Sequence, residues 1–439
     1  MSATAKPLVI EKHAAYNKPR MFFLSVCALV TAGLSFAMRS SIAGDLQKTF
    51  LDPIDRLRSA EMIGAILGVA FLGFAFTIAI GSPLLDKIGM GRLLGLSGVC
   101  FIGGTLIVIF AGSLAQGGAI YNVLWGGMLL NGIGWGLVET VINPLTATLY
   151  PAEKTARLNI LHAWWPGGII IGGLIGLAIG QLNMSWQVKL AVVMLPAAVV
   201  AIGCLGTKFP RTERTEMGIS TKETFQELAR PMFVVWFLSM FLTAASELAP
   251  GQWVDMALTR TVGFKGIWLL IYVSGLMFVM RHFAGPLAHK FSPVGLLWIS
   301  CLLASTGLIL LSVANSAVTG LLAATVWGTG VCYMWPTMLA VTSERFPRGG
   351  ALLMGLMGTA GTLSIYFVLP QMGKIFDWAK VNAAGGESAF SALTGEGLNR
   401  VLAIASQTSF RYVAALPAIL LIVFGAIWLH DRSKGGYHR

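Results

Sequence analysis

Polar side chains recur at every fourth position of one otherwise apolar stretch. Because each helical residue advances by 100°, this spacing predicts one slowly drifting face of a single helix. The four residues are Asn131, Trp135, Glu139 and Asn143. A carboxylate at the centre of an apolar helix in a bilayer costs roughly 3 kcal/mol on insertion scales. We therefore expect Glu139 either to face a water-filled or ligand-filled cavity or to pair with Arg39.

Other apolar segments also contain polar groups. Glu247 precedes Pro250, which would free backbone carbonyls to line a cavity, and it is either a site residue or a cap at a helix end. Arg39 either donates hydrogen bonds to a substrate or pairs with Glu139 or Glu247. Carboxylates, an arginine, amides and indoles together would suit a solute with many hydroxyl groups. The candidate binding set is Glu139, Asn143, Arg39, His162, Trp165, Glu247, Gln252, Trp253, Tyr333 and Trp335.

His162 is the other candidate for proton chemistry. Its imidazole could titrate near neutral pH and share proton movement with Glu139, so these two residues form the candidate coupling pair. The alternative is a histidine that is simply hydrogen-bonded within the core.

The composition indicates a membrane protein. Of 439 residues, 56% are hydrophobic and 11% are charged, whereas soluble domains carry about 25% charged residues. The net charge of +12 comes from short loops without an aromatic and basic patch, which argues against nucleic-acid binding. The sequence has no phosphate loop, nucleophile–base motif or metal-ligand spacing, so we expect no enzyme activity, cofactor or metal.

Apolar runs of about twenty residues predict an all-α integral membrane protein with twelve transmembrane helices in two pseudo-symmetric halves of six. The predicted helices are 21–44, 60–86, 91–113, 119–150, 158–180, 186–208, 231–258, 264–289, 293–315, 317–343, 348–375 and 408–430. The predicted divisions are an amino-terminal tail 1–20, a first half 21–208, a central loop 209–230, a second half 231–430 with a long external loop 377–405, and a tail 431–439.

The distribution of basic residues predicts the orientation. With the amino terminus inside, the inner loops hold 19 Lys and Arg residues and the outer loops hold 10. We therefore expect a multi-pass protein of the cell (inner) membrane with both termini in the cytoplasm. The polar, basic start of the chain argues against a cleaved signal peptide.

The two halves resemble each other. SPLLDK at 82–87 matches GPLAHK at 285–290, and Pro144 and Pro336 each follow a glycine-rich helix start and precede a basic loop. Internal repeats of this size are typical of secondary transporters, with the solute bound between the halves near the membrane midplane. The pattern favours a monomeric transporter of a small molecule.

The loop after the second predicted helix resembles the signature G-x-L-x-D-R/K-x-G-R/K-R/K of the major facilitator superfamily. The matching residues are Leu84, Asp86, Lys87 and Gly89. The signature ends in two basic residues, and in this chain Arg92 is the basic residue near that position. The resemblance implies the major facilitator fold and a conformational latch in this loop. The candidate gating residues are Asp86, Lys87, Arg92, Arg157 and Arg281.

The stretch ETVINPLTATLYPAEKTARLN resembles the fucose–proton symporter subfamily, as do RHFAG at 281–285 and WPT at 335–337. In that subfamily a glutamate at the position of Glu139 serves sugar recognition and proton coupling together with an aspartate on the first helix. Here Arg39 lies where that acid is expected, whereas His162 and Trp165 occupy positions where the subfamily has amides.

These patterns together predict a secondary transporter that moves a monosaccharide or similar polyhydroxylated solute by alternating access. We expect a proton or sodium ion as the coupling ion. The alternatives within transporters are a drug or amphiphile exporter coupled to protons and an organic-anion transporter that uses Arg39. A non-transporting membrane sensor is the alternative from another class.

Overall fold

A computed structural model describes residues 16–150, 154–211, 228–259, 263, 265–281, 290–346 and 350–435. Within these ranges the secondary structure is entirely helical. Most of the predicted amino-terminal tail, residues 212–227 of the predicted central loop, residues 282–289 of the predicted eighth helix and the last four residues lie outside the described part. The repeat match at 285–290 therefore falls almost wholly outside it.

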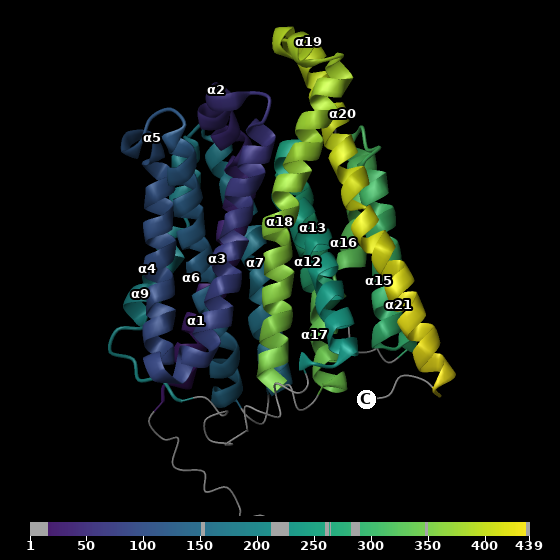
Figure 1. Ribbon diagram of the computed structural model, residues 1–439. Helices are drawn as coiled ribbons and strands as arrows, with labels where there is room; N and C mark the ends of the chain where they lie inside the picture. Colours follow the sequence, from purple (N-terminus) through teal and green to yellow (C-terminus); the bar gives the residue numbers. More distant parts are fainter. Residues whose placement is uncertain are drawn as a thin grey trace, which may run out of the picture.

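The first half of the chain forms one bundle of helices (Figure 1). The prolonged first helix continues through a π-helical turn into a short helix before the chain reverses into α3. The elements are α1 (Lys18–Leu46), η1 (Gln47–Leu51), α2 (Asp52–Asp55), α3 (Ser59–Ile88), α4 (Met90–Ile109), α5 (Ala111–Leu114), α6 (Ala119–Leu149), α7 (Lys154–Gln181), α8 (Trp186–Ala191) and α9 (Met194–Gly203).

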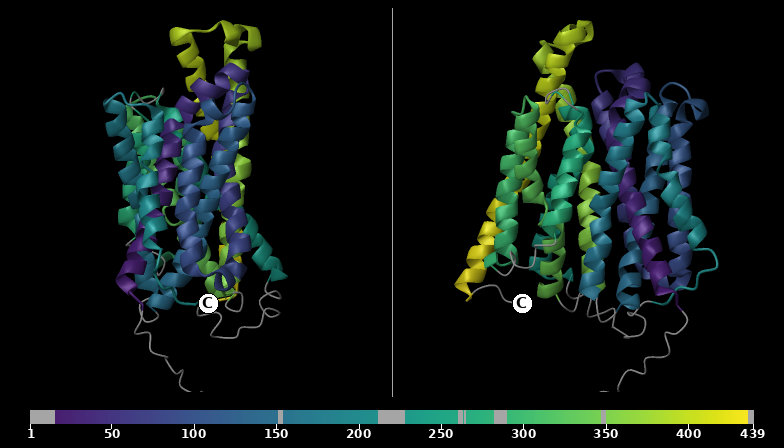
Figure 2. Two further views of the ribbon diagram at one scale, coloured as in Figure 1. Left: turned by 90° about the vertical axis from the view of Figure 1, so that its left-hand side faces the viewer. Right: turned by 180° about the vertical axis from the view of Figure 1, so that it is seen from behind.

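The second half forms a second bundle beside the first, as Figures 1 and 2 both show. Its elements are α12 (Pro231–Leu258), α13 (Ile267–Met280), α15 (Pro293–Leu311), α16 (Ala317–Val331), α17 (Met334–Arg345), α18 (Gly350–Ala384), α19 (Glu387–Ala392), α20 (Gly395–Val413) and α21 (Ala415–Ser433). We call the end of the molecule with α2, α5 and α19 the α19 end, and the opposite end the α17 end.

The helices are long and apolar enough to cross a bilayer. Nine helical segments among the described residues meet that criterion by length and composition, and α13 is a shorter apolar helix. A bilayer core of about 30 Å requires about twenty such residues per crossing. The predicted all-α membrane fold class is confirmed.

The two bundles contact each other mainly along α3 and α18, with further contacts between α7 and α13 and between α1 and α12. Glycines permit the close approach of α3 and α18. A methyl group on Gly64 would lie 2.5 Å from the carbonyl oxygen of Leu369, and one on Gly373 would lie 2.2 Å from that of Ala60. Because larger side chains would force the backbones apart, these glycines determine how closely the bundles pack.

The segment 377–405, which the sequence predicts as a long loop, is almost wholly helical. α18 continues to Ala384, α19 follows after a short turn, and α20 begins at Gly395. This helical hairpin projects beyond the other helices at the α19 end (Figure 2). α20 is the more amphipathic part, with Val401, Ala405 and Phe410 buried.

Prolines interrupt the hydrogen-bond ladder inside α6, α7, α12 and α18 and at the break between α16 and α17. Pro336 has no N–H for the carbonyl of Cys332, and the chain breaks between α16 and α17 at that point. Pro250 likewise frees the carbonyl of Ser246, which accepts from the Trp327 indole at 3.1 Å. That carbonyl is therefore paired within the second bundle.

Candidate functional site

The strongest polar cluster in the first bundle joins a carboxylate, an amide and an imidazole. Asn143 Nδ2 donates to Glu139 Oε2 at 3.1 Å, one helical turn away on α6. Asn143 Oδ1 lies 2.7 Å from His162 Nε2 on α7, so the imidazole donates from that nitrogen. All three side chains are partly exposed.

The candidate coupling pair is thus connected through Asn143. Protonation of Glu139 at Oε2 would remove the acceptor that holds the Asn143 amide, and the amide would then be free to reorient. The hydrogen bonds thus connect a carboxylate on α6 to an imidazole on α7.

Aromatic rings form a second cluster one turn further along α6. The indoles of Trp135 and Trp165 are stacked with centroids 6.2 Å apart, and Phe36 on α1 contacts both rings edge-on. Phe71 and Phe74 on α3 contact Trp135 from the other side. The indole N–H groups of Trp135 and Trp165 are buried and have no acceptor. Two N–H donors beside stacked rings suit a ligand with oxygen atoms and an apolar face.

Arg39 lies one turn beyond Phe36 on α1, against this aromatic cluster. Its guanidinium carbon lies 5.5 Å from the Phe71 centroid and 5.8 Å from the Trp135 centroid. The residue is 2% exposed, and its Nε donates to the carbonyl of Ser35 at 3.4 Å. Neither of the acids that the sequence offered as partners, Glu139 or Glu247, forms an ion pair with it.

Glu247 pairs within the second bundle. Arg281 Nη2 lies 3.5 Å from Glu247 Oε1, and Arg281 Nε donates to the Cys332 carbonyl that Pro336 leaves free. Glu247 is 6% exposed and its Oε2 has no hydrogen-bond partner. The arginine that the sequence assigned to gating therefore joins a candidate binding carboxylate to the break between α16 and α17.

The other candidates of the second bundle differ in accessibility. Gln252 Nε2 donates to the carbonyl of Phe36 at 2.9 Å, between the bundles, while its Oε1 is buried without a donor. Trp253 is fully buried against Phe376, and the Tyr333 hydroxyl donates to the Met280 carbonyl at 3.1 Å. Trp335 is partly buried, and its ring packs against Gly361 of α18.

The predicted latch residues lie at the α17 end, away from these clusters. Lys87 and Arg92 are exposed on either side of Gly89, whose φ of +98° makes the turn between α3 and α4. A cavity of about 780 Å³ lies beside this turn, and Arg92 and Phe209 contribute to its lining. The Asp86 side chain lies outside the described part.

Arg157, the remaining candidate for gating, lies near the start of α7. Its guanidinium carbon lies 4.6 Å from the ring centroid of Tyr150. Both residues line a cavity of about 670 Å³ together with Trp164 and the beginning of α1. Arg157 therefore contacts the end of the α6 segment.

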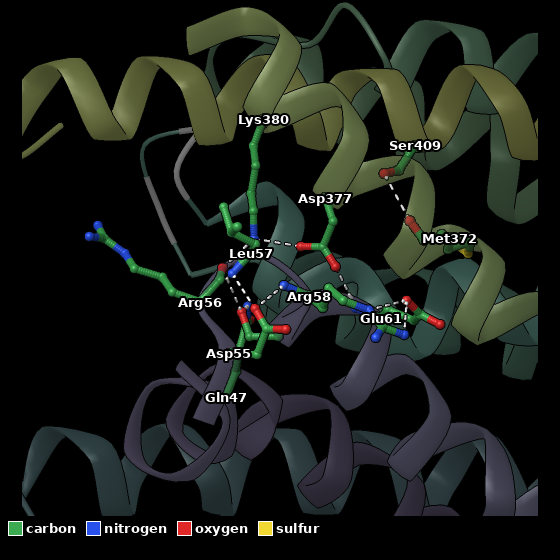
Figure 3. A network of polar contacts seen from close by, with 11 residues as sticks. Gln47, Asp55, Arg56, Leu57, Arg58, Glu61, Met372, Asp377, Lys380 and Ser409 are labelled. Atoms are coloured by element: carbon green, nitrogen blue, oxygen red, sulfur yellow. Dashed lines mark hydrogen bonds and ion pairs between the residues drawn. The ribbon is translucent and has the colours of Figure 1, made fainter. Parts of the chain in front are cut away.

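Sequence reasoning missed a polar network between the bundles at the α19 end (Figure 3). Asp377 Oδ2 accepts from the backbone N–H of Glu61 at 2.8 Å, in the first turn of α3. Lys380 Nζ lies 2.5 Å from Asp377 Oδ1 and donates to the Arg56 carbonyl at 2.8 Å. Lys374 adds an ion pair of 3.5 Å with Glu61.

A signal for this network is present in the sequence. Lys374, Asp377 and Lys380 recur at every third position, the spacing of neighbours on one helical face. The predicted helix ends at residue 375, so this spacing was assigned to a loop. The partners in the turn after α2 and on α3 come from the other bundle, and local patterns carry no information about such pairs.

The family follows from comparison with known proteins. A family model described as the Major Facilitator Superfamily matches residues 21–370, which is most of the chain. The chain belongs to this superfamily. The predicted membership is confirmed, and the protein is a membrane transporter rather than an enzyme.

Curated relatives of the chain are named as sugar and polyol transporters. Plastidic glucose transporter 4 of Arabidopsis thaliana is 26% identical over 322 residues, 70% of this chain and 53% of that protein. The H(+)/hexose cotransporter 1 of Parachlorella kessleri is 28% identical over 136 residues, and the myo-inositol transporter 1 of Candida albicans is 27% identical over 172 residues. These two matches cover 31% and 38% of this chain, and 24% and 26% of the relatives. The chain thus matches about a quarter to a half of the relatives' lengths.

Solved structures of the superfamily share the fold. A D-xylose–proton symporter superposes with a TM-score of 0.72 at 16% identity, covering 88% of this chain and 96% of that chain. FucP in its outward conformation superposes with a TM-score of 0.56 at 16% identity, over 92% and 99% of the two chains. At these identities the likeness establishes the fold.

Proposed function

We propose that this transporter moves a monosaccharide or similar polyhydroxylated solute across the cell (inner) membrane by alternating access, coupled to a proton. The observation that carries the proposal is a set of polar groups contributed by both bundles, together with stacked aromatic rings. Glu139, Asn143 and His162 lie on one side, the Glu247–Arg281 pair lies on the other, and two indole N–H groups have no acceptor. Hydroxyl groups would pair with these atoms, and the rings would cover the apolar face of a sugar.

The relatives support a sugar as the solute. The three curated relatives carry glucose, hexose or myo-inositol in their names, and the structural neighbours include a xylose–proton symporter. Each of these solutes has several hydroxyl groups on a compact ring. Glu139 together with Asn143 offers acceptors and donors for such groups on adjacent turns of α6.

Alternating access is supported by where the bundles contact each other. The hydrogen bonds between described residues of the two bundles lie toward the α19 end, namely Ser40 to the Gly251 carbonyl, Gln252 to the Phe36 carbonyl, and the network around Asp377. We infer that this structure is the state closed at the α19 end. The excess of basic residues in the predicted inner loops supports a cytoplasmic location for the α17 end.

Proton coupling rests on the chain of hydrogen bonds from Glu139 through Asn143 to His162. Both end groups can carry a proton, and a change at Glu139 would release the amide that holds His162. Sodium is the other candidate ion. It prefers several oxygen ligands, and the imidazole in this chain makes the proton the better match.

The test is uptake of labelled hexoses and polyols by proteoliposomes under an imposed gradient. We expect an inward proton gradient to drive accumulation and the substitution Glu139→Gln to abolish it. The matched control is Glu387→Gln, an exposed glutamate on α19. Accumulation driven by sodium instead would reject proton coupling, and unchanged accumulation in Glu139→Gln would reject the role of this carboxylate.

A further inference from the structure

Arg39 is a buried cation without an anion. It is 2% exposed in the middle of a long apolar helix, and an arginine remains protonated in proteins. Among the described residues no carboxylate oxygen lies within 4.0 Å of its nitrogens, and Nη1 has no hydrogen-bond partner. An uncompensated charge at such a position is rare and marks a functional site by default.

The aromatic contacts of Arg39 compensate only part of the cost of burial. The ring centroids of Phe71 and Trp135 lie 5.5 and 5.8 Å from the guanidinium carbon. Cation–π contacts of this kind offset only part of the cost of removing an ion from water. A single long hydrogen bond to the Ser35 carbonyl adds little. The site therefore favours the arrival of a negative charge.

The protein's own acids are occupied elsewhere. Glu247 holds Arg281 in the second bundle, and Glu139 accepts from Asn143 one turn beyond Trp135. Neither side chain is directed to Arg39. The anion that neutralises the guanidinium must therefore be a ligand from outside the chain, or one of these acids after a rearrangement that breaks its present contact.

The surroundings of Arg39 indicate what else the anion carries. The unpaired N–H groups of Trp135 and Trp165 lie in the aromatic cluster that Arg39 contacts, and the unpaired Oε1 of Gln252 belongs to a side chain bonded to the Phe36 carbonyl. Two donors and one acceptor suit hydroxyl groups, and the stacked indoles suit a ring. A single positive charge matches a single carboxylate.

We propose that the solute is a polyhydroxylated carboxylate, such as a hexuronate or an aldonate, whose carboxylate pairs with Arg39. This inference rests on the proposed function and specifies its substrate class. Guanidinium and carboxylate form two parallel hydrogen bonds, which orient the solute and neutralise both charges within the membrane. The hydroxyl groups of the solute then reach the indole N–H groups, Gln252 and the Glu139–Asn143 pair.

The test measures binding to the purified full-length protein by thermal shift, with pairs of solutes that differ in one group. The pairs are glucuronate with glucose and galacturonate with galactose, and glucosamine and a lipophilic cation complete the set. A ligand that binds the folded state stabilises it, and the stabilisation grows with the logarithm of the ratio of its concentration to Kd. We expect each uronate to bind at least tenfold more tightly than its neutral partner.

Variants of Arg39 test whether its guanidinium causes the tighter binding of uronates. Arg39→Gln should remove the advantage of the uronates, and Arg39→Lys should retain part of it because the charge remains. Arg400→Gln, at an exposed position of α20, is the matched control and should change nothing. If Arg39→Gln does not fold, the comparison of uronates with neutral hexoses on the unsubstituted protein decides alone.

Three outcomes would contradict the inference. Hexoses that bind as tightly as uronates would reject the pairing of a solute carboxylate with Arg39 and leave the proposed sugar transport intact. Stabilisation by the lipophilic cation alone would reject both proposals. A protein that no uronate stabilises would reject the inference as well.

Discussion

At the scale of single residues, the pairs of polar side chains depend on which helix faces lie against each other. Glu139, Asn143 and His162 were all candidates, and the structure joins them in one chain of hydrogen bonds. Arg39 and Glu247 were expected to be possible partners, yet Glu247 pairs with Arg281. Periodicity on one helix reveals which side chains share its face. It does not reveal which face of another helix lies opposite, and that packing decides the pairs.

The two unpaired indoles provide a test at this scale. Replacing Trp135 or Trp165 by Phe keeps an aromatic ring but removes an N–H donor. A lost hydrogen bond to a ligand is worth roughly 1 kcal/mol, and more if the acceptor is charged. We expect each substitution to weaken solute binding about fivefold to tenfold, measured as the solute concentration that gives half of the maximal thermal stabilisation.

The matched control is Trp378→Phe, at an exposed position of α18. It should leave binding unchanged. If Trp135→Phe and Trp165→Phe also leave binding unchanged, the indole N–H groups do not contact the solute. The aromatic cluster would then be a packing feature of the first bundle alone.

At the scale of elements, the positions of most long helices could be predicted because each is a run of apolar residues. The predicted segment 231–258 coincides with α12, and 119–150 coincides with α6 to within one residue. The end of α18 could not be predicted in this way. Its last turns are polar, and they remain helical because Asp377 and Lys380 bind the turn before α3 rather than solvent.

The network at the end of α18 should control opening of the α19 end. Asp377→Asn would leave Lys380 buried without its counter-charge, and breaking a buried ion pair costs roughly 3–5 kcal/mol. We expect the state closed at the α19 end to lose most of its stability relative to the state open at that end. A cysteine in place of Ser40, which is buried where α1 meets α12, should then react at least tenfold faster with a membrane-impermeant maleimide.

Glu387→Gln on the neighbouring α19 is the control for the loss of a surface carboxylate. It should not change the rate at Ser40→Cys, and protein without that cysteine corrects for the native thiols. An equal rate in Asp377→Asn would mean that Figure 3 depicts contacts that stabilise the fold without governing the opening between the bundles.

At the scale of the whole molecule, composition alone predicted the class of protein, and the family comparison confirmed it. With 11% charged residues, the chain can only fold with most of its surface in lipid. The arrangement of the two bundles could not be read from the sequence. It depends on close approaches such as that of Gly373 to Ala60, between residues more than three hundred positions apart.

We propose that a polyhydroxylated solute crosses the membrane by alternating access at a site between the two bundles. Counterflow tests it most directly, because it requires no coupling ion. Proteoliposomes loaded with unlabelled sugar or uronate should transiently accumulate the labelled solute above its external concentration. Glu139→Ala should lose this accumulation, whereas Glu387→Ala should retain it. Absence of enrichment for every polyhydroxylated solute, or full counterflow in Glu139→Ala, would contradict transport at this site.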